Sequence, residues 1–276
     1  MPSFRDSVVL ITGAASGIGT ALATAAAERG AAVIVTDLDG GGAERVAEGL
    51  RKKGFASDSR PLDVTDRSAF KAVVDDVVTS RGRIDFLFNN AGIGVTGEAR
   101  DLSPDAWDRV IDVNLKGVIH GIQAAYPHMV DRGSGHIANT ACVAGLVPFP
   151  MTSAYCASKH AVVGLSTSLR AEASSLGVGV SVICPGLVAT NMFDHIEYYA
   201  VDKATLIQPV ERAMVSPERC ASQVLRGVER NRAVITVNAH AGLVWWLYRH
   251  APRPFMAVTG YLFKKMRSRL RTPTKP

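Results

Sequence analysis

The stretch Val8-Val9-Leu10-Ile11-Thr12-Gly13-Ala14-Ala15-Ser16-Gly17-Ile18-Gly19 decides the fold of this chain. A short apolar run stands directly before a glycine-rich turn, and an Ala-rich segment of helical period follows. This order predicts a buried strand that turns tightly into a helix. Glycine permits close backbone approach, and the helix N-terminus offers free N–H groups to a dinucleotide pyrophosphate. Such a turn can also need glycine for its geometry alone, so both interpretations stay open.

The same alternation continues to about residue 237, which is typical of repeated βαβ units and a parallel sheet buried on both faces. The predicted fold class is α/β: a doubly wound (Rossmann) seven-stranded parallel sheet with helices on both faces. We expect strands near 7–12, 32–36, 55–60, 84–88, 135–140, 178–183 and 233–237. We expect helices near 17–29, 41–53, 66–80, 104–131, 152–176 and 216–230.

The chain contains no Pro/Ser/Gly-rich linker that would separate two folded domains. We therefore expect one dinucleotide-binding catalytic domain over residues 1–237 and a basic, aromatic, helical C-terminal extension over 238–276. The connection at about 190–215 is irregular, and long connections inside compact domains are often lids or binding loops. We expect it to form the substrate loop.

The composition is that of a soluble globular protein, with 47% hydrophobic and 20% charged residues among 276. The first apolar run is too short for a signal peptide or a membrane span. The four cysteines form no CxxC pair and have no histidine partners at metal spacing, which argues against a disulfide framework and a metal site. These features predict a cytoplasmic protein without a metal.

The positive charge is concentrated at the C-terminus. Residues 231–276 hold nine Lys/Arg and no Asp/Glu, so a chain with a net charge of +6 has a net charge of −3 over residues 1–230. This distribution, together with the lack of a recognition motif, predicts no nucleic-acid partner. The tail suits peripheral membrane contact on anionic lipid, or packing over the substrate mouth or against a neighbouring subunit. Of these, we favour packing.

Asp37 stands at the end of the second predicted strand, about 20 residues beyond the glycine turn. A carboxylate there accepts hydrogen bonds from the adenosine ribose hydroxyls and repels a 2′-phosphate. Because neither the turn nor the residues beside Asp37 supply a cation, the sequence predicts NAD rather than NADP as the cofactor. Asp37 could instead cap the following helix.

Further motifs follow in order: Asp63-Val64, Asn89-Asn90-Ala91-Gly92, Asn114, Tyr155-xxx-Lys159 and Pro185-Gly186-Leu187-Val188-Ala189-Thr190. Together with Thr12–Gly19 they make the chain resemble the short-chain dehydrogenase/reductase family up to about residue 237. Asn-Ala-Gly and Pro-Gly can also be plain turns. The resemblance implies an NAD-dependent oxidoreductase whose cofactor contacts Gly13, Ser16, Gly17, Ile18, Gly19, Asp37, Asp63, Val64, Asn90, Ala91, Gly92, Tyr155, Lys159, Pro185, Gly186, Val188 and Thr190.

The resemblance also implies a catalytic set of Asn114, Tyr155, Lys159 and the residue at position 142. Hydride transfer requires a proton to move to or from the substrate oxygen, and Tyr155 is the expected acid/base. Lys159 follows four residues later on the same helix face, so we expect its ammonium to lower the phenol pKa. In the family this lysine also holds the nicotinamide ribose and, with the residue matching Asn114, a water-linked proton path.

Cys142 departs from the family, which places a serine thirteen residues before the tyrosine. A thiol is bulkier and a weaker donor than a hydroxyl, so we expect binding to survive better than turnover. A neighbouring tyrosinate or lysine could also make the thiol reactive. The change is either a deliberate serine-to-cysteine replacement or a natural variant, and we favour the former because every other motif is intact.

The residues expected near the substrate are mostly apolar, and they could line a pocket or simply fill the core. As pocket residues they favour a hydrophobic secondary alcohol or ketone of steroid, terpenoid, aryl or fatty type, as in hydroxysteroid dehydrogenases. The alternative is a catalytically impaired nicotinamide-binding sensor or partner-binding protein. The resemblance further implies a homotetramer or homodimer built from the helices near 104–131 and 152–176. The apolar residues are Val143, Leu146, Val147, Phe149, Met151, Met192, Phe193 and Ile196.

Overall fold

The computed structural model describes residues 3–208 and 213–272. Its centre is a parallel sheet in the order β3-β2-β1-β4-β6-β7-β9, which confirms the predicted fold class. The order reverses between β1 and β4, and open α/β sheets bind ligands beyond the carboxyl ends of the strands at such a point. The strands are β1 (Val8–Thr12), β2 (Ala32–Asp37), β3 (Ser57–Pro61), β4 (Phe86–Asn89), β6 (Gly135–Thr140), β7 (Val178–Pro185) and β9 (Val234–Val237).

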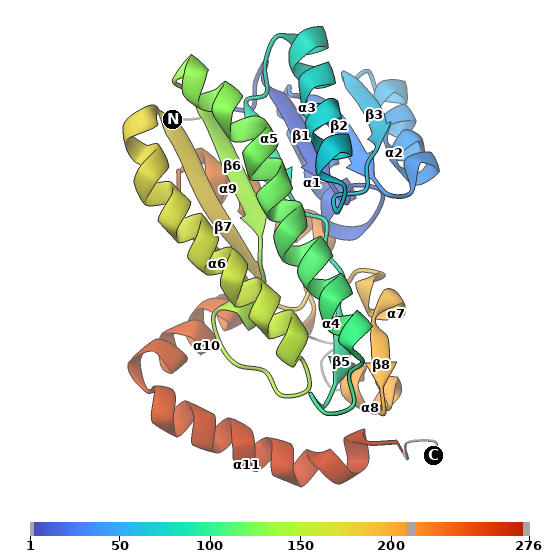
Figure 1. Ribbon diagram of the computed structural model, residues 1–276, viewed down its shortest axis with the longest axis vertical. Helices are drawn as coiled ribbons and strands as arrows, with labels where there is room; N and C mark the ends of the chain where they lie inside the picture. Colours follow the sequence, from blue (N-terminus) through green and yellow to red (C-terminus); the bar gives the residue numbers. More distant parts are fainter. Residues whose placement is uncertain (1–2, 209–212, 273–276) are drawn as a thin grey trace.

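Helices cover both faces of the sheet (Figure 1). Alternate side chains of each strand enter opposite cores: Val9 and Ile11 of β1 pack on one side, and Val8 and Leu10 on the other. The first core is completed by α1 (Gly17–Ala27), α2 (Gly40–Lys52) and α9 (Pro217–Glu229). The second is completed by α3 (Arg67–Arg81), α5 (Gly117–Arg132) and α6 (Ser153–Ala173).

The prediction of one continuous α-helix over 104–131 is wrong. The segment consists of α4 (Pro104–Ile111), a π-helical turn (Asp112–Lys116) and α5. A π turn inserts a residue without changing the apolar composition, so the sequence pattern does not show it. This wider turn holds the buried Asn114.

The expected substrate loop at 190–215 contains regular structure, although its residues 209–212 lie outside the described ranges. It carries α7 (Met192–His195), β8 (Glu197–Tyr199) and α8 (Lys203–Ile207). Strand β8 pairs in parallel with β5 (Val95–Gly97), which follows the fourth sheet strand. The loop is thereby tied to the segment after β4. Elsewhere in the chain, residues Val143–Gly145 and Ser174–Leu176 each form a short 3-10 helix.

The C-terminal extension is helical as far as it is described, with residues 273–276 outside the described ranges. Helix α10 (Ala239–His250) follows β9, and α11 (Pro252–Leu270) runs across the end of the molecule where the strands terminate (Figure 1). Within residues 3–208 and 213–272, no helix combines the length and apolarity that crossing a membrane requires.

Candidate active site

The ends of β1 and β4 are joined by hydrogen bonds from a single threonine. Thr12 Oγ1 accepts from the backbone N–H groups of Asn90 and Ala91, both at 3.0 Å. The Asn90 amide nitrogen donates to the carbonyls of Thr12 and Gly13 at 3.1 and 3.2 Å. These bonds hold the 90–92 turn against the glycine turn. The sequence analysis did not name Thr12 as a site residue, although it stands at the start of the Thr12–Gly19 motif.

The glycine turn is packed too closely for side chains. A β-carbon added at Gly13, whose φ is +63°, would lie 2.7 Å from the Ala91 Cα, and one at Gly19 would lie 2.1 Å from the Gly13 carbonyl oxygen. Ser16 is the N-cap residue of α1 but makes no side-chain cap bond. The N-terminal N–H groups of α1, including that of Ile18, therefore have no side-chain cap, and they fit a pyrophosphate.

Asp37 lies beside this turn. Its Oδ2 accepts from the Ala15 N–H at 2.9 Å and its Oδ1 from the Asp39 N–H at 3.0 Å. The N-cap residue of α2 is Asp39, which accepts from the Gly42 N–H at 2.9 Å. The alternative interpretation of Asp37 as the helix cap is therefore wrong. A carboxylate has about four acceptor positions, so Asp37 retains capacity for ribose hydroxyls.

The segment after β7 approaches the same turn from the other side. A β-carbon at Gly17 would lie 3.1 Å from Thr190 Cγ2, and Val188 pairs with Val215. Within this segment the Pro185 carbonyl faces Cys142, and Gly186 packs so closely on Asn238 that a β-carbon would lie 2.9 Å from its amide nitrogen.

Asp63 and Val64 follow β3 at the same edge of the sheet. Asp63 is exposed and accepts from the Thr65 N–H at 2.9 Å. Val64 is buried, and its carbonyl oxygen lies 2.9 Å from His120 Nδ1. The structure thus brings the predicted cofactor residues to one edge of the sheet.

Tyr155 and Lys159 occupy the first two turns of α6 and face the end of β6. Lys159 Nζ donates to the Thr140 carbonyl at 2.9 Å and lies 5.6 Å from the centroid of the Tyr155 ring. The Tyr155 hydroxyl and the Cys142 thiol lie close enough for each group to shift the pKa of the other. Cys142 Sγ also donates to the Pro185 carbonyl at 3.5 Å. The thiol, the phenol and the amine thus form one cluster.

Asn114 closes this cluster from the π turn. Its Nδ2 donates to the Ile93 carbonyl at 2.9 Å and to Ser158 Oγ at 3.1 Å, while its Oδ1 accepts from the Ile93 N–H at 2.8 Å. A β-carbon at Gly92 would lie 3.1 Å from Asn114 Oδ1 and 3.3 Å from Lys159 Nζ. Gly92 therefore lies next to both the Asn114 amide and the Lys159 amine. Ser158 is a second residue that sequence reasoning missed.

The charges in the cluster differ from the sequence-based expectation. Burial raises the pKa of Tyr155 well above its usual value of 10, and the neighbouring Cys142 raises it further. Burial lowers the pKa of Lys159 to about 8. The expected lowering of the Tyr155 pKa by Lys159 is therefore wrong for this structure, because the amine bonds to Thr140 and desolvation of the phenol dominates.

The sequence left open that a neighbouring tyrosinate or lysine makes the thiol of Cys142 reactive, and the surroundings of the thiol oppose this. Burial raises the pKa of Cys142, and this outweighs the lowering by the Ala144 backbone, Tyr155 and Lys159. The thiol and the phenol are both protonated at neutral pH.

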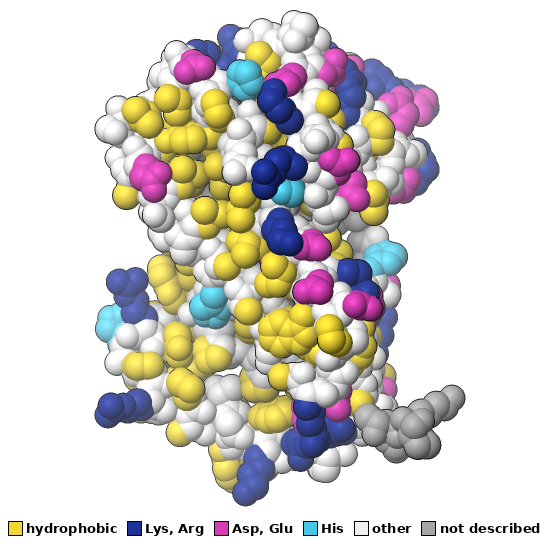
Figure 2. All heavy atoms as spheres, viewed as in Figure 1, with side chains coloured by type: hydrophobic (Ala, Val, Ile, Leu, Met, Phe, Trp, Pro, Cys, Tyr) yellow, Lys and Arg dark blue, Asp and Glu magenta, His cyan; other side chains and the backbone are white. Residues whose placement is uncertain are grey.

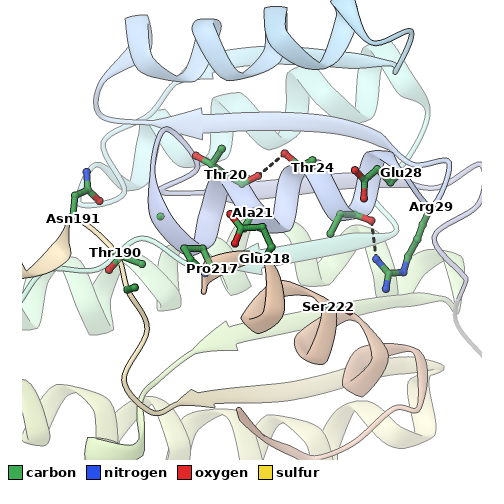
Figure 3. Close-up of a pocket in the computed structure, with 13 residues that line it drawn as sticks. Thr20, Ala21, Thr24, Glu28, Arg29, Thr190, Asn191, Pro217, Glu218 and Ser222 are labelled. Carbon is green, nitrogen blue, oxygen red and sulfur yellow. Dashed lines mark hydrogen bonds between the residues drawn. The ribbon is translucent and has the colours of Figure 1, made fainter. Parts of the chain in front are cut away.

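A hollow of about 740 Å³ adjoins this edge, between α1, α9 and residues 189–191 (Figure 3). It shares Gly17 and Thr190 with the predicted cofactor residues, but Tyr155 and Lys159 do not line it. Its lining includes the carboxylates of Glu28 and Glu218, which repel phosphate. The hollow therefore leads away from the catalytic cluster along the outer side of α1.

The apolar residues expected around the substrate fall into two groups. Leu146 and Val147 are buried in the second core, so the core-filling interpretation holds for them. Met192 and Ile196 lie over Gly94, where a β-carbon would be 3.5 and 3.0 Å from their side chains. Of the other residues, Met151 is buried against Val201 and Leu270, Val143 and Phe193 are partly buried, and Phe149 is exposed.

A family model described as short chain dehydrogenase matches residues 7–198. The chain belongs to the short-chain dehydrogenase/reductase family. It is 32% identical over 265 residues to "Probable oxidoreductase EphD" of Mycobacterium tuberculosis, an alignment that covers 91% of this chain and 44% of EphD. The chain therefore spans less than half the length of that relative.

For a second relative and for one solved structure, the alignment covers a larger share of the matched protein. The chain is 40% identical over 186 residues to 2-(S)-hydroxypropyl-CoM dehydrogenase 3 of Xanthobacter autotrophicus. This alignment covers 67% of this chain and 73% of that protein. A short-chain dehydrogenase/reductase of Burkholderia phymatum, solved in complex with NAD, superposes with a TM-score of 0.84 at 29% identity. That superposition covers 100% of this chain and 99% of the Burkholderia chain, so it includes the C-terminal extension.

Proposed function

We propose that this chain is an NAD(H)-dependent oxidoreductase that interconverts a hydrophobic secondary alcohol and its ketone. The observation that carries the proposal is the cluster of Tyr155, Lys159 and Cys142 beside a glycine turn whose helix has no side-chain cap. A phenol, an amine and a dinucleotide cradle at the carboxyl edge of one sheet are the groups that carbonyl reduction requires. A relative whose name describes a hydroxypropyl dehydrogenase supports the same chemistry.

In this proposal the chain's own groups handle the proton. Tyr155 keeps its proton at neutral pH and donates it to the carbonyl oxygen of a bound ketone. Lys159 donates to the Thr140 carbonyl and would also hold the nicotinamide ribose of a bound cofactor, while Asn114 fixes the turn at Ile93. When bound between the glycine turn and Thr190, NADH supplies the hydride.

The preference for NAD over NADP rests on Asp37. Its carboxylate lies at the end of β2 beside Ala15, where the adenosine ribose of a dinucleotide on the glycine turn would lie. A 2′-phosphate there would meet a negative charge. Neither Ala14 nor Ala15 supplies a cation to offset that repulsion.

We further propose that Cys142 stands at the position of the family's serine and lowers turnover. Its thiol donates to the Pro185 carbonyl and lies beside Tyr155, so the bulkier sulfur occupies space next to the phenol that must face the substrate. A serine hydroxyl is smaller and a stronger donor, and it would orient the substrate oxygen better.

The decisive experiment is NADH consumption against a panel of hydrophobic ketones, for this chain and its Cys142→Ser variant. We expect the serine variant to have at least about tenfold higher kcat, since loss of one oxyanion donor typically costs 10²- to 10³-fold. Equal activity of the two proteins would contradict an impairing role of Cys142. If both bind NADH but neither reduces any ketone, the sensor or partner-binding alternative replaces the enzyme.

A further inference from the structure

The C-terminal helices carry most of the exposed large apolar side chains of the described molecule. Of eleven such side chains in residues 3–208 and 213–272, eight lie on α10 and α11, and they are 41% to 58% exposed. Single exposed apolar residues are ordinary, but a group of this size marks an interaction surface. We call it the tail face: Leu243, Trp246 and Leu247 on α10, with Met256, Val258, Tyr261, Leu262 and Met266 on α11.

Both helices are already anchored by other side chains. On α10, Val244, Trp245 and Tyr248 pack beside the second core, and the tail-face residues Leu243, Trp246 and Leu247 point the other way at helical spacing. On α11, Leu270 is buried against Met151 and Val201, and Phe263 packs on the same cluster. The side chains of the tail face are therefore not needed to pack the two helices onto the rest of the protein.

Cations accompany the tail face. Arg267 and Arg271 pair with Glu98, whereas Arg249, Arg253, Lys264, Lys265 and Arg269 have no carboxylate partner within the part of the chain that the structure describes. Lys265 Nζ lies 4.9 Å above the ring of Tyr261, and the Arg249 guanidinium lies 5.8 Å from the ring of Trp245. Figure 2 shows dark blue and yellow side chains at the lower end of the molecule, where Figure 1 places α10 and α11.

We propose that the tail face binds the surface of an anionic phospholipid bilayer. Apolar and aromatic helix segments that end in Lys and Arg suit helices that lie in the headgroup layer, where long cationic chains reach the lipid phosphates. A second copy of the same face fits less well. A two-fold interface would bring the cations of one copy close to those of the other, and residues 231–276 contain no Asp or Glu to neutralise them.

The test is co-sedimentation of the full chain with vesicles of phosphatidylglycerol and phosphatidylcholine, compared with vesicles of phosphatidylcholine alone. We expect binding to the anionic vesicles that weakens as salt rises, together with a blue shift of the tryptophan fluorescence. The double change Lys264→Glu and Lys265→Glu should lower the partition coefficient at least about tenfold. Trp246→Ser should weaken binding at every salt concentration.

The controls carry the same double charge reversal, and a comparable apolar-to-polar change, elsewhere on the surface. Lys52→Glu with Lys53→Glu, and Leu176→Gln, alter exposed residues far from the tail face and should leave vesicle binding unchanged. Thermal melting verifies that each variant is folded. Absence of binding to anionic vesicles, or equal losses in the tail and control variants, overturns the proposal. So does a concentration-dependent dimer that Trp246→Ser dissociates while no vesicle is bound, since the occupant is then a second copy.

Discussion

Burial affects the pKa of Tyr155 more strongly than the neighbouring ammonium of Lys159 does. Lys159 lies close enough to stabilise a tyrosinate, but its Nζ bonds to the Thr140 carbonyl, and the buried phenol lies beside the neutral thiol of Cys142. The pKa of the phenol rises and that of the amine falls to about 8. Both shifts reduce buried charge, which is the direction that desolvation dictates. The Tyr155 phenol is therefore arranged to donate a proton.

Asp37 gives a prediction at the scale of one carboxylate. Asp37→Asn keeps the side-chain shape but removes the charge that repels a 2′-phosphate. We expect the Kd for NADH to rise roughly tenfold, because a charged hydrogen-bond acceptor becomes neutral, and the Kd for NADPH to fall relative to it. Titration of protein with each reduced dinucleotide, followed by fluorescence, measures both constants.

The neighbouring Asp39 supplies the control. Asp39→Asn keeps a side chain that caps α2 well, so the fold and the cofactor preference should both be retained. An unchanged ratio of the two dissociation constants in Asp37→Asn would show that this carboxylate does not select the cofactor.

At the scale of elements, the buried strands could be predicted and the edge features could not. Each of the seven sheet strands lies within two residues of its expected bounds, mostly because short apolar runs beside turns have few other interpretations. Strand β3, with the sequence Ser-Asp-Ser-Arg-Pro, has no such run. Strands β5 and β8 have three residues each, too few for a period to appear. The π turn at Asn114 and the raised Tyr155 pKa depend on tertiary packing, which no local pattern encodes.

The end of α11 is held by an ion cluster that no motif indicated. Glu98, in the segment after β5, accepts from Arg267 Nε at 2.6 Å and from Arg271 at 2.7 Å. These contacts, with Arg100, lower the pKa of Glu98 to about 2. The cluster joins the tail to the segment that pairs with the expected substrate loop.

Glu98→Gln should therefore loosen α11 without unfolding the sheet. Amide hydrogen exchange in residues 263–271 should accelerate roughly tenfold, because a carboxylate that binds two guanidinium groups becomes a neutral amide. Glu48→Gln, which removes an exposed helix pair with Lys52, is the control and should leave that exchange unchanged. Equal protection of α11 in wild type and Glu98→Gln would mean that Leu270 and its neighbours hold the helix alone.

For the whole molecule, the response to acid depends on a histidine inside the sheet. His136 of β6 is 1% exposed, and its Nε2 lies 2.9 Å from Ser181 Oγ of β7. Burial, with Arg170 nearby, lowers the pKa of His136 from 6.5 to about 4. Between these values the unfolded chain binds a proton that the folded chain excludes, so the free energy of unfolding decreases as the pH falls.

This linkage contributes about 3 kcal/mol between pH 6.5 and pH 4, at 1.36 kcal/mol for each pKa unit. His136→Gln keeps a group that can bond to Ser181 but removes the titration. We expect urea unfolding of this variant to depend less on pH in that window, even if its stability at pH 7 is lower. His240→Gln, at an exposed site on α10, should retain the wild-type dependence. Parallel curves for wild type and His136→Gln would mean that His136 does not carry the acid sensitivity, and that groups such as Glu98 dominate it.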